Sequence, residues 1–172
     1  LASLLVSVFL VKETYGKTEE ILGNWFQEKK NRDKIILASK IASKSDGLEW
    51  IREGSENLGF DKKNMNAAID ASLKRLKTDY IDLYQLHWPE RKVPKFGQLD
   101  YKYDPTDNTW TTIEEVLFNL NELVKDGKVR HVGLSNETPW GMMKFLEVAM
   151  QKSLLRMMSI QNVYSLVNRV FD

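Results

Sequence analysis

Apolar and polar positions along the chain predict helices and strands in alternation. Apolar residues recur at helical spacing in some segments, and short apolar runs lie between those segments. The predicted helices are residues 17–30, 64–77, 111–126 and 137–152. The predicted strands are residues 34–40, 79–87, 129–136 and 156–161. Because strand and helix follow one another so regularly, we expect right-handed βαβ units and a parallel sheet.

The first residues form a separate apolar run. Residues 1–11 are apolar except for Ser3 and Ser7, and the run ends at Lys12. It is shorter than the roughly 20 residues that a membrane-spanning helix needs. No basic residue precedes it and no small-residue cleavage site follows, so a secretory signal is not indicated. We expect a buried strand or helix here and, since no Met begins the chain, a piece of a longer protein.

Composition narrows the class of protein. With 172 residues, 42% hydrophobic and 28% charged, the chain is expected to form one domain over residues 1–172. A net charge of +1 does not favour nucleic acid or an anionic membrane as a partner. The absence of Cys excludes disulfides and thiolate chemistry, and two His residues form no recognisable metal motif. We therefore expect a soluble, cytoplasmic protein without a metal site.

Polar residues stand where each predicted strand ends. They are Lys40, His87, Ser135 with Asn136, and Gln161 with Asn162. The carboxyl ends of parallel strands lie at one edge of a sheet or barrel, where ligands bind. Taken singly, a lysine here is usually solvated and a histidine is usually a hydrogen-bonded core residue. Together they predict one site in which the side chains of Lys40 and His87 converge.

Other chemical motifs are absent from the sequence. It contains no G-x-G-x-x-G, P-loop, G-x-S-x-G or H-E-x-x-H pattern. Asp79 and Asp82 are three residues apart and so do not share a strand face. We interpret them as a cap at the start of the strand and a buried, hydrogen-bonding aspartate. The aromatic loop 96–110 could stack bases, but the charges of Lys92, Lys95 and Lys102 are offset by Asp100, Asp104 and Asp107, which disfavours nucleic-acid binding.

Several motifs nevertheless resemble one known family. The segment LKRLKTDYIDLYQLH at 73–87 resembles the signature of the aldo-keto reductase superfamily. GLSN at 133–136, IQNVYSL at 160–166 and ILASK at 36–40 match further family motifs in the same order. The loop that begins HWPER at 87–91 resembles the bacterial Tas-like branch. The resemblance implies an α/β fold, a partial (β/α)8 TIM barrel, covering roughly strands two or three to six.

The resemblance also implies a function. The family reduces aldehydes and ketones with a nicotinamide cofactor, usually NADP(H). Lys40 matches the lysine that lowers the pKa of a catalytic tyrosine, and His87 matches the histidine that hydrogen-bonds the carbonyl oxygen. The residues that match those holding the nicotinamide carboxamide are Ser135, Asn136 and Gln161. Trp88, beside His87, is expected to line the pocket for a small carbonyl substrate.

Tyr15 leaves two interpretations open. Tyr15-Gly16 resembles the family's catalytic Asp-x-x-x-x-Tyr-Gly motif, but Leu10 stands where that motif has Asp. The alternative is a loop tyrosine at the entrance to a helix. The resemblance also places the adenosine-binding units outside residues 1–172, so we expect the isolated chain to be impaired or inactive and to self-associate through open barrel edges. Alternatives from other classes are a nicotinamide-binding regulatory subunit, as in the channel β-subunits of this fold, and an inactive truncated product.

Overall fold

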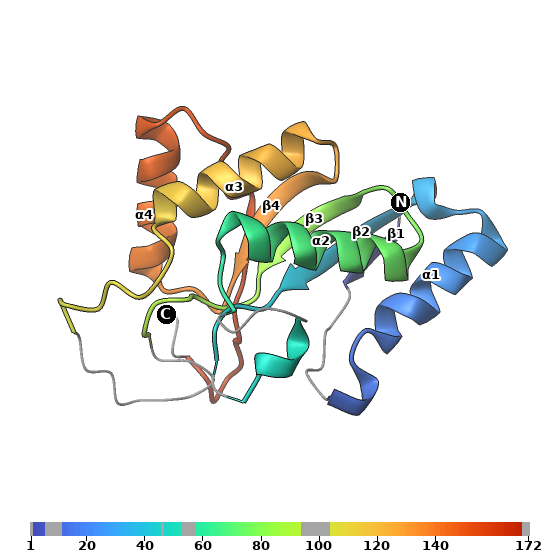
Figure 1. Ribbon diagram of the computed structural model, residues 1–172, viewed down its shortest axis with the longest axis horizontal. Helices are drawn as coiled ribbons and strands as arrows, with labels where there is room; N and C mark the ends of the chain where they lie inside the picture. The colour runs from blue at the N-terminus through green and yellow to red at the C-terminus, as the bar shows by residue number, and fades with distance from the viewer. Residues whose placement is uncertain (1, 6–11, 46, 53–57, 94–103, 170–172) are drawn as a thin grey trace.

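The computed structural model, which describes residues 2–5, 12–45, 47–52, 58–93 and 104–169, contains a curved parallel β-sheet (Figure 1). Its strands are β1 (Ala2–Leu5), β2 (Ile35–Ile41), β3 (Ile81–Leu86), β4 (Val129–Ser135) and β5 (Ser159–Gln161). They lie in the order β1-β2-β3-β4-β5, and each neighbouring pair is parallel. Sequential parallel strands of this kind are those of a partial (β/α)8 barrel, which confirms the predicted fold class.

Helices connect the strands and cover one face of the sheet. They are α1 (Lys17–Lys29), α2 (Lys62–Leu76), α3 (Ile113–Lys125) and α4 (Pro139–Gln151), with short 3-10 helices η1 (Lys12–Thr14), η2 (Arg32–Lys34) and η3 (Glu49–Ile51). Figure 1 shows α2 and α3 in front of the sheet. Within the described residues, the structure has no helix with the length and apolar character that crossing a membrane requires.

The helix ends follow from local sequence chemistry. The side chains of Asp61, Thr112 and Thr138 each accept a hydrogen bond from the backbone N–H three residues on, at 3.0, 3.2 and 3.1 Å. Pro139 occupies the first turn of α4, where its missing N–H costs nothing. Gly127, which follows the end of α3, has a φ of 75°, which glycine adopts without strain. These residues explain why the observed helices begin and end close to the predicted limits.

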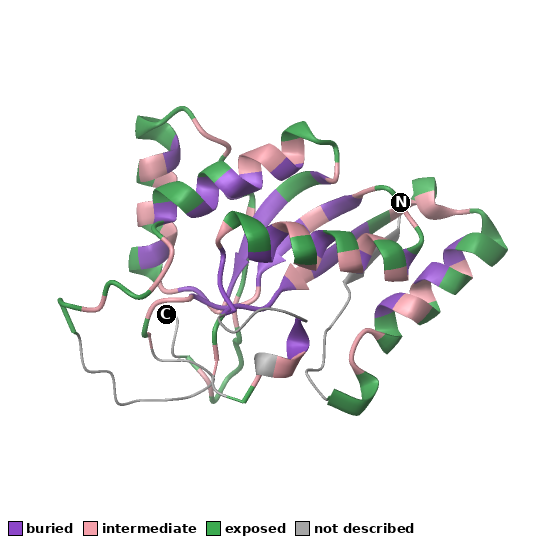
Figure 2. Ribbon diagram, viewed as in Figure 1, coloured by how far each residue is buried: buried purple, intermediate pink, exposed green. Residues whose placement is uncertain are grey.

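The main core lies between the sheet and the helices. Alternate residues of the strands point toward the helices, among them Leu37, Tyr84 and Leu134, each no more than 1% exposed. Apolar residues of the helices pack against them: Phe26, Met65, Ile69, Leu117, Leu120 and Phe145. Figure 2 shows this buried layer as purple segments on the strands and on the inward sides of the helices. Burial of these side chains is the main force that stabilises the half-barrel.

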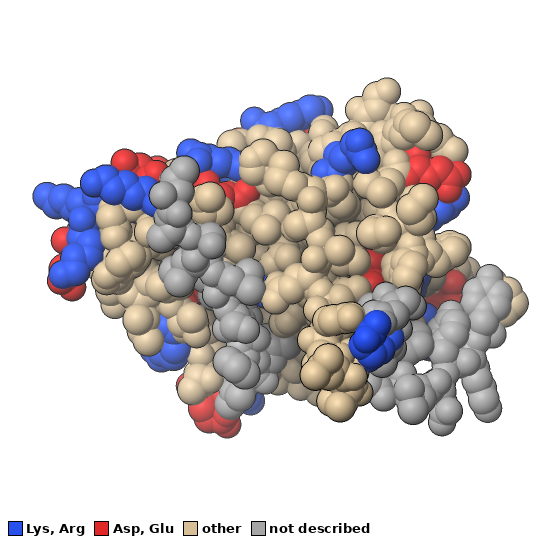
Figure 3. Space-filling model, turned by 180° about the vertical axis from the view of Figure 1, so that it is seen from behind, with Lys and Arg blue, Asp and Glu red and all other residues tan. Residues whose placement is uncertain are grey.

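The other face of the sheet carries a different set of residues. Ile36, Ala38 and Lys40 are alternate residues of β2 and therefore share this second face, on which Ile36 is 42% exposed. The strand register aligns Lys40 with Gln85, and Gln85 with Gly133. In the view from behind, uncharged residues occupy most of the centre and charged side chains lie mainly toward the margins (Figure 3). The two faces thus divide the strand residues between an apolar core and a face that carries Lys40.

The amino end of the sheet is fixed by a buried carboxylate. Asp82 accepts hydrogen bonds from the Leu37 backbone N–H at 3.0 Å and from Arg32 and Arg130 at 2.8 Å each. Burial alone would raise the pKa of Asp82, but these donors outweigh it and lower the pKa below its usual value. The interpretation of Asp82 as a buried hydrogen-bonding residue is confirmed.

Some predicted boundaries differ from the observed ones. The strand predicted over 79–87 begins at Ile81, because Asp79 is exposed and the Tyr80 carbonyl accepts from the Arg32 side chain instead of a strand partner. The strand predicted over 156–161 is shorter and spans Ser159–Gln161. Of the apolar run 1–11, Ala2–Leu5 pairs with β2 as a strand, and residues 6–11 lie outside the described residues.

Candidate functional site

Polar residues meet at the carboxyl ends of β2 to β5, as the sequence predicts. Lys40 is the penultimate residue of β2, and His87 directly follows β3. Asn136 directly follows β4, and Gln161 is the last residue of β5. We call these four residues the C-terminal rim.

Hydrogen bonds join the rim from strand to strand. The His87 backbone N–H donates to the Ile41 carbonyl at 2.9 Å, and Asn136 Nδ2 donates to the His87 carbonyl at 2.9 Å. Ser135 Oγ and the Asn136 backbone N–H both donate to the Gln161 carbonyl, at 2.9 and 3.1 Å. The ends of all these strands are therefore held in one continuous network.

Lys40 and His87 line the same pocket. Ser39 Oγ donates to Glu19 of α1 at 2.8 Å, so the next residue, Lys40, points to the opposite face of β2. Burial lowers the pKa of Lys40 below its usual value. Burial and then the nearby Lys40 charge lower the pKa of His87 to about 4, so its imidazole is neutral at pH 7.

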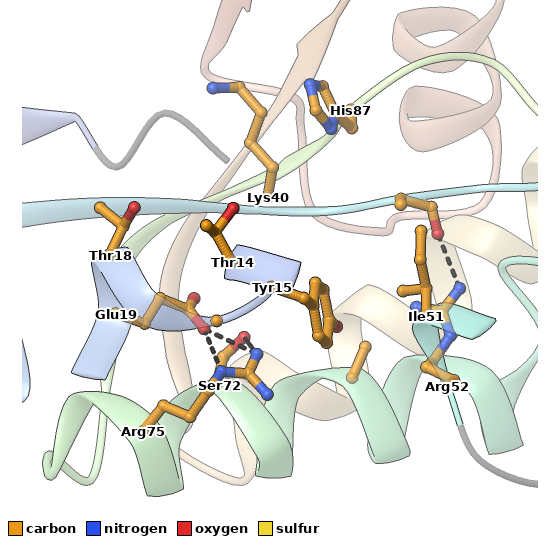
Figure 4. A pocket seen from close by; sticks show the side chains of 13 residues that line it. Thr14, Tyr15, Thr18, Glu19, Lys40, Ile51, Arg52, Ser72, Arg75 and His87 are labelled. Atoms are coloured by element: carbon orange, nitrogen blue, oxygen red, sulfur yellow. Dashed lines mark hydrogen bonds and ion pairs between the residues drawn. The ribbon is translucent and has the colours of Figure 1, made fainter. Parts of the chain in front are cut away.

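Tyr15 borders this pocket from the helix side. Its ring lies edge-on to Trp50, with centroids 5.5 Å apart, and 5.2 Å from the guanidinium of Arg75. In Figure 4, the side chains of Lys40 and His87 extend to one side of the β2 ribbon and Tyr15 lies on the other. The structure thus brings Tyr15 to the pocket and engages its ring with neighbouring side chains.

A buried ion pair supports that wall of the pocket. Glu19, 3% exposed, accepts from Arg75 Nε at 2.7 Å and from Ser39 Oγ. Arg75 also donates to Ser72 Oγ at 3.2 Å. The pair therefore joins α1, α2 and β2 beneath Tyr15 (Figure 4).

Trp88 lies beside the rim but in a small core. It is 2% exposed and packs with Ala42, Ile51 and Leu58. Its indole N–H donates to the Lys44 carbonyl at 3.2 Å, and its ring centroid lies 4.5 Å from that of His87. Trp88 therefore packs behind His87, and its contact with substrate stays a prediction.

Sequence reasoning assigned no role to Arg91 or Glu137, and it placed Asn162 only among the polar residues at the strand ends. Arg91 forms an ion pair with Glu137, and Asn162 hydrogen-bonds the backbone of Glu137 on both sides. The only signals were positional, since Glu137 follows the GLSN motif and Asn162 lies within IQNVYSL. The partnership of Arg91 and Glu137, which are 46 residues apart, has no local pattern in the sequence.

Comparison with known proteins confirms the family resemblance. The profile described as "Aldo/keto reductase family" matches residues 12–172. Protein tas of Escherichia coli (strain K12) is 43% identical over 162 residues, which cover 93% of this chain and 45% of that protein. The aldo-keto reductase of Babesia bovis is 43% identical over 142 residues, 79% of this chain and 49% of that protein.

A relative with lower identity also matches most of this chain and less than half of its own length. Norsolorinic acid reductase B of Aspergillus parasiticus is 32% identical over 154 residues, 90% of this chain and 36% of that protein. The chain thus spans less than half the length of these relatives. Since the family profile covers nearly all of the described residues, the chain belongs to the aldo/keto reductase family.

Proposed function

We propose that this chain supplies the catalytic lysine and histidine and the nicotinamide-binding rim of an NADP(H)-dependent reductase of aldehydes and ketones. The observation that carries the proposal is the pocket that Lys40 and His87 line together. Hydrogen bonds join the His87 carbonyl to Asn136, and Asn136 to Gln161. The relatives from Babesia bovis and Aspergillus parasiticus are named as reductases, which supports the direction of the reaction. A small-molecule substrate and a cytoplasmic location belong to the same proposal.

His87 is suited to bind a carbonyl oxygen. Because its pKa is lowered to about 4, its imidazole is neutral at pH 7 and keeps one N–H to donate. A donor directed at the oxygen on which negative charge develops stabilises the transition state. His87 therefore polarises the carbonyl group without transferring a proton itself.

Lys40 contributes positive charge beside His87. Its ammonium is partly desolvated, which strengthens its interaction with any anionic group in the pocket. A positive charge of this kind stabilises a phenolate and so helps a tyrosine to release its proton. Tyr15 is the tyrosine that lines this pocket, although its contacts with Trp50 and Arg75 favour the role of a loop tyrosine.

The rim fits a nicotinamide carboxamide. Asn136 Nδ2 already donates to the His87 carbonyl, which leaves Asn136 Oδ1 to accept from an amide N–H. The Gln161 side chain is exposed at the rim and offers both a donor and an acceptor. Ser135, 4% exposed, donates its hydroxyl proton to the Gln161 carbonyl and holds the two strands together. When bound, the nicotinamide supplies the hydride.

A second candidate is nicotinamide binding without turnover. It is favoured by Leu10, which stands where the family motif has Asp, and by the engagement of the Tyr15 ring with Arg75. A regulatory subunit or an inactive product would have this property. The two candidates differ in turnover and agree in nicotinamide binding.

Titration of NADPH fluorescence against the purified chain tests the binding step. Asn136→Ala should weaken NADPH binding, whereas Asn66→Ala on α2 should not, because Asn66 is neither a rim residue nor one of the residues that line the pocket. Equal affinities for wild type and Asn136→Ala would overturn the assignment of the rim. Oxidation of NADPH by a simple aldehyde, lost in Lys40→Met, would then distinguish the reductase from the non-catalytic alternative.

A further inference from the structure

The backbone at Asn136 has an unusual conformation. Its φ is 50°, in the left-handed region that asparagine adopts more readily than most residues other than glycine. Such a conformation persists where the surrounding structure holds it. The direction of the side chain that fits the nicotinamide therefore depends on the contacts that hold this backbone conformation.

Asn162 supports the peptide that follows. Its Oδ1 accepts from the Glu137 backbone N–H at 3.1 Å, and its Nδ2 donates to the Glu137 carbonyl at 2.9 Å. The two hydrogen bonds fix the backbone N–H and the backbone carbonyl of Glu137 to the segment after β5. They therefore restrict the backbone immediately after Asn136.

Arg91 holds the side chain of the same residue. Both of its terminal nitrogens donate to the carboxylate of Glu137, and the two side chains are 11% and 3% exposed. Arg91 also donates to Thr138 Oγ1 at 3.1 Å, and its guanidinium lies 5.1 Å from the Trp140 ring centroid. A bidentate pair of this kind fixes orientation as well as distance.

Gly141 provides the space for this pair. A Cβ atom at Gly141 would overlap both Arg91 Nη2 and Glu137 Oε1. Alanine is otherwise the better residue within a helix. Gly141→Ala therefore disturbs the ion pair by shape alone, without changing a charge.

We propose that Arg91, Glu137 and Asn162 are positioning residues that hold Asn136 in its left-handed conformation and so set its amide for the nicotinamide. The inference rests on the proposed function, and it extends that function to residues that contact neither cofactor nor substrate. The structural half of the inference is that these three residues hold the backbone of Asn136. The functional half is that this backbone conformation sets the affinity for NADPH.

Amide hydrogen exchange of the full chain tests the structural half. In Glu137→Gln and Asn162→Ala, exchange of the Asn136 N–H should accelerate about tenfold or more relative to the His87 N–H, which bonds to β2. Asp82→Asn removes a comparably buried ion pair at the other end of the sheet and should affect both amides alike. An Asn136 amide that changes no more than that of His87 would overturn the inference.

NADPH affinity tests the functional half with the same variants. Glu137→Gln, Asn162→Ala and Gly141→Ala should raise the dissociation constant about fivefold or more. Asn162→Asp should give a smaller loss, because it keeps the acceptor for the Glu137 N–H. Faster exchange with unchanged NADPH affinity would overturn the positioning role. If NADPH binds neither to this chain nor to a protein that supplies the remaining barrel, the proposed function fails and the positioning role for the nicotinamide fails with it. The exchange data still decide whether the three residues hold Asn136.

Discussion

The low pKa of His87 predicts a specific dependence of stability on pH. The folded imidazole has a pKa of about 4, against the reference value of 6.5. Between these values the unfolded chain binds a proton that the folded chain does not, so stability falls as pH falls through this window. At 1.36 kcal/mol per pKa unit, a difference of roughly 2.5 units corresponds to about 3 kcal/mol. This stabilisation is fully present above pH 6.5 and lost by about pH 4.

Urea unfolding at pH 7.5 and pH 4.5 measures the effect. Other groups also titrate between these pH values and change the stability of wild type and variant alike. The effect of His87 is therefore the difference between the fall in stability of wild type and that of His87→Gln. The wild-type midpoint should fall by about 1–2 M more than that of the variant, given the usual dependence of stability on urea. His131→Asn, which removes the chain's other histidine, is the matched control. An equal fall in wild type and His87→Gln would refute the burial argument and with it the neutral imidazole at pH 7.

Further predictions concern the site, the sheet and the assembly. Lys40→Met, in a protein that supplies the remaining barrel, should slow hydride transfer by about 10²–10⁴-fold with little change in cofactor affinity; equal losses in both would make Lys40 a cofactor contact. Tyr15→Phe should leave turnover unchanged if Tyr15 is a loop tyrosine, and abolish it if the hydroxyl transfers the proton, as NADPH oxidation will show. Asp82→Asn should lower the free energy of unfolding, measured in urea, by about 3–5 kcal/mol, because it leaves the half-buried Arg32 without its carboxylate. Size-exclusion chromatography should show self-association of the isolated chain through the β5 edge, where Ile160 is 41% exposed, and a monomer at all concentrations would contradict this.

The fold could be predicted because the spacing of apolar residues is repeated within each helix and each strand. Helical spacing of apolar residues is repeated many times in residues 111–126, and α3 buries Leu117 and Leu120 on that spacing. Capping residues such as Thr112 and Thr138 add local signals at the helix starts. The predicted strand boundaries are less accurate than the predicted helix boundaries. A strand ends where its hydrogen-bonded partner strand ends, and the local sequence does not show where the partner ends.

The site was predictable only in part for the same physical reason. Lys40 and His87 could be placed because parallel strands bring their carboxyl ends together. The contact of Tyr15 with Arg75 could not be predicted from the sequence, because it depends on how α1 packs against α2. Trp88 shows the same limit, since its neighbour His87 faces the pocket while its own ring packs into a small core.

The ion pairs of Asp82 and Glu137 lie at opposite ends of the sheet, and we expect their loss to affect different parts of the structure. Burying two charges costs much of what their attraction gains, so such pairs are better evidence for a fixed geometry than for stability. Asp82 fixes the start of β2 against β3, since it binds the Leu37 N–H as well as Arg32, and its loss affects strands that the whole core packs upon. Glu137 with Arg91 joins the connection after β4 to the segment after β3 and binds no strand residue among those that the structure describes. A substitution of Asp82 should therefore change the free energy of unfolding of the whole chain, whereas a substitution of Glu137 should change mainly the exchange of the Asn136 N–H.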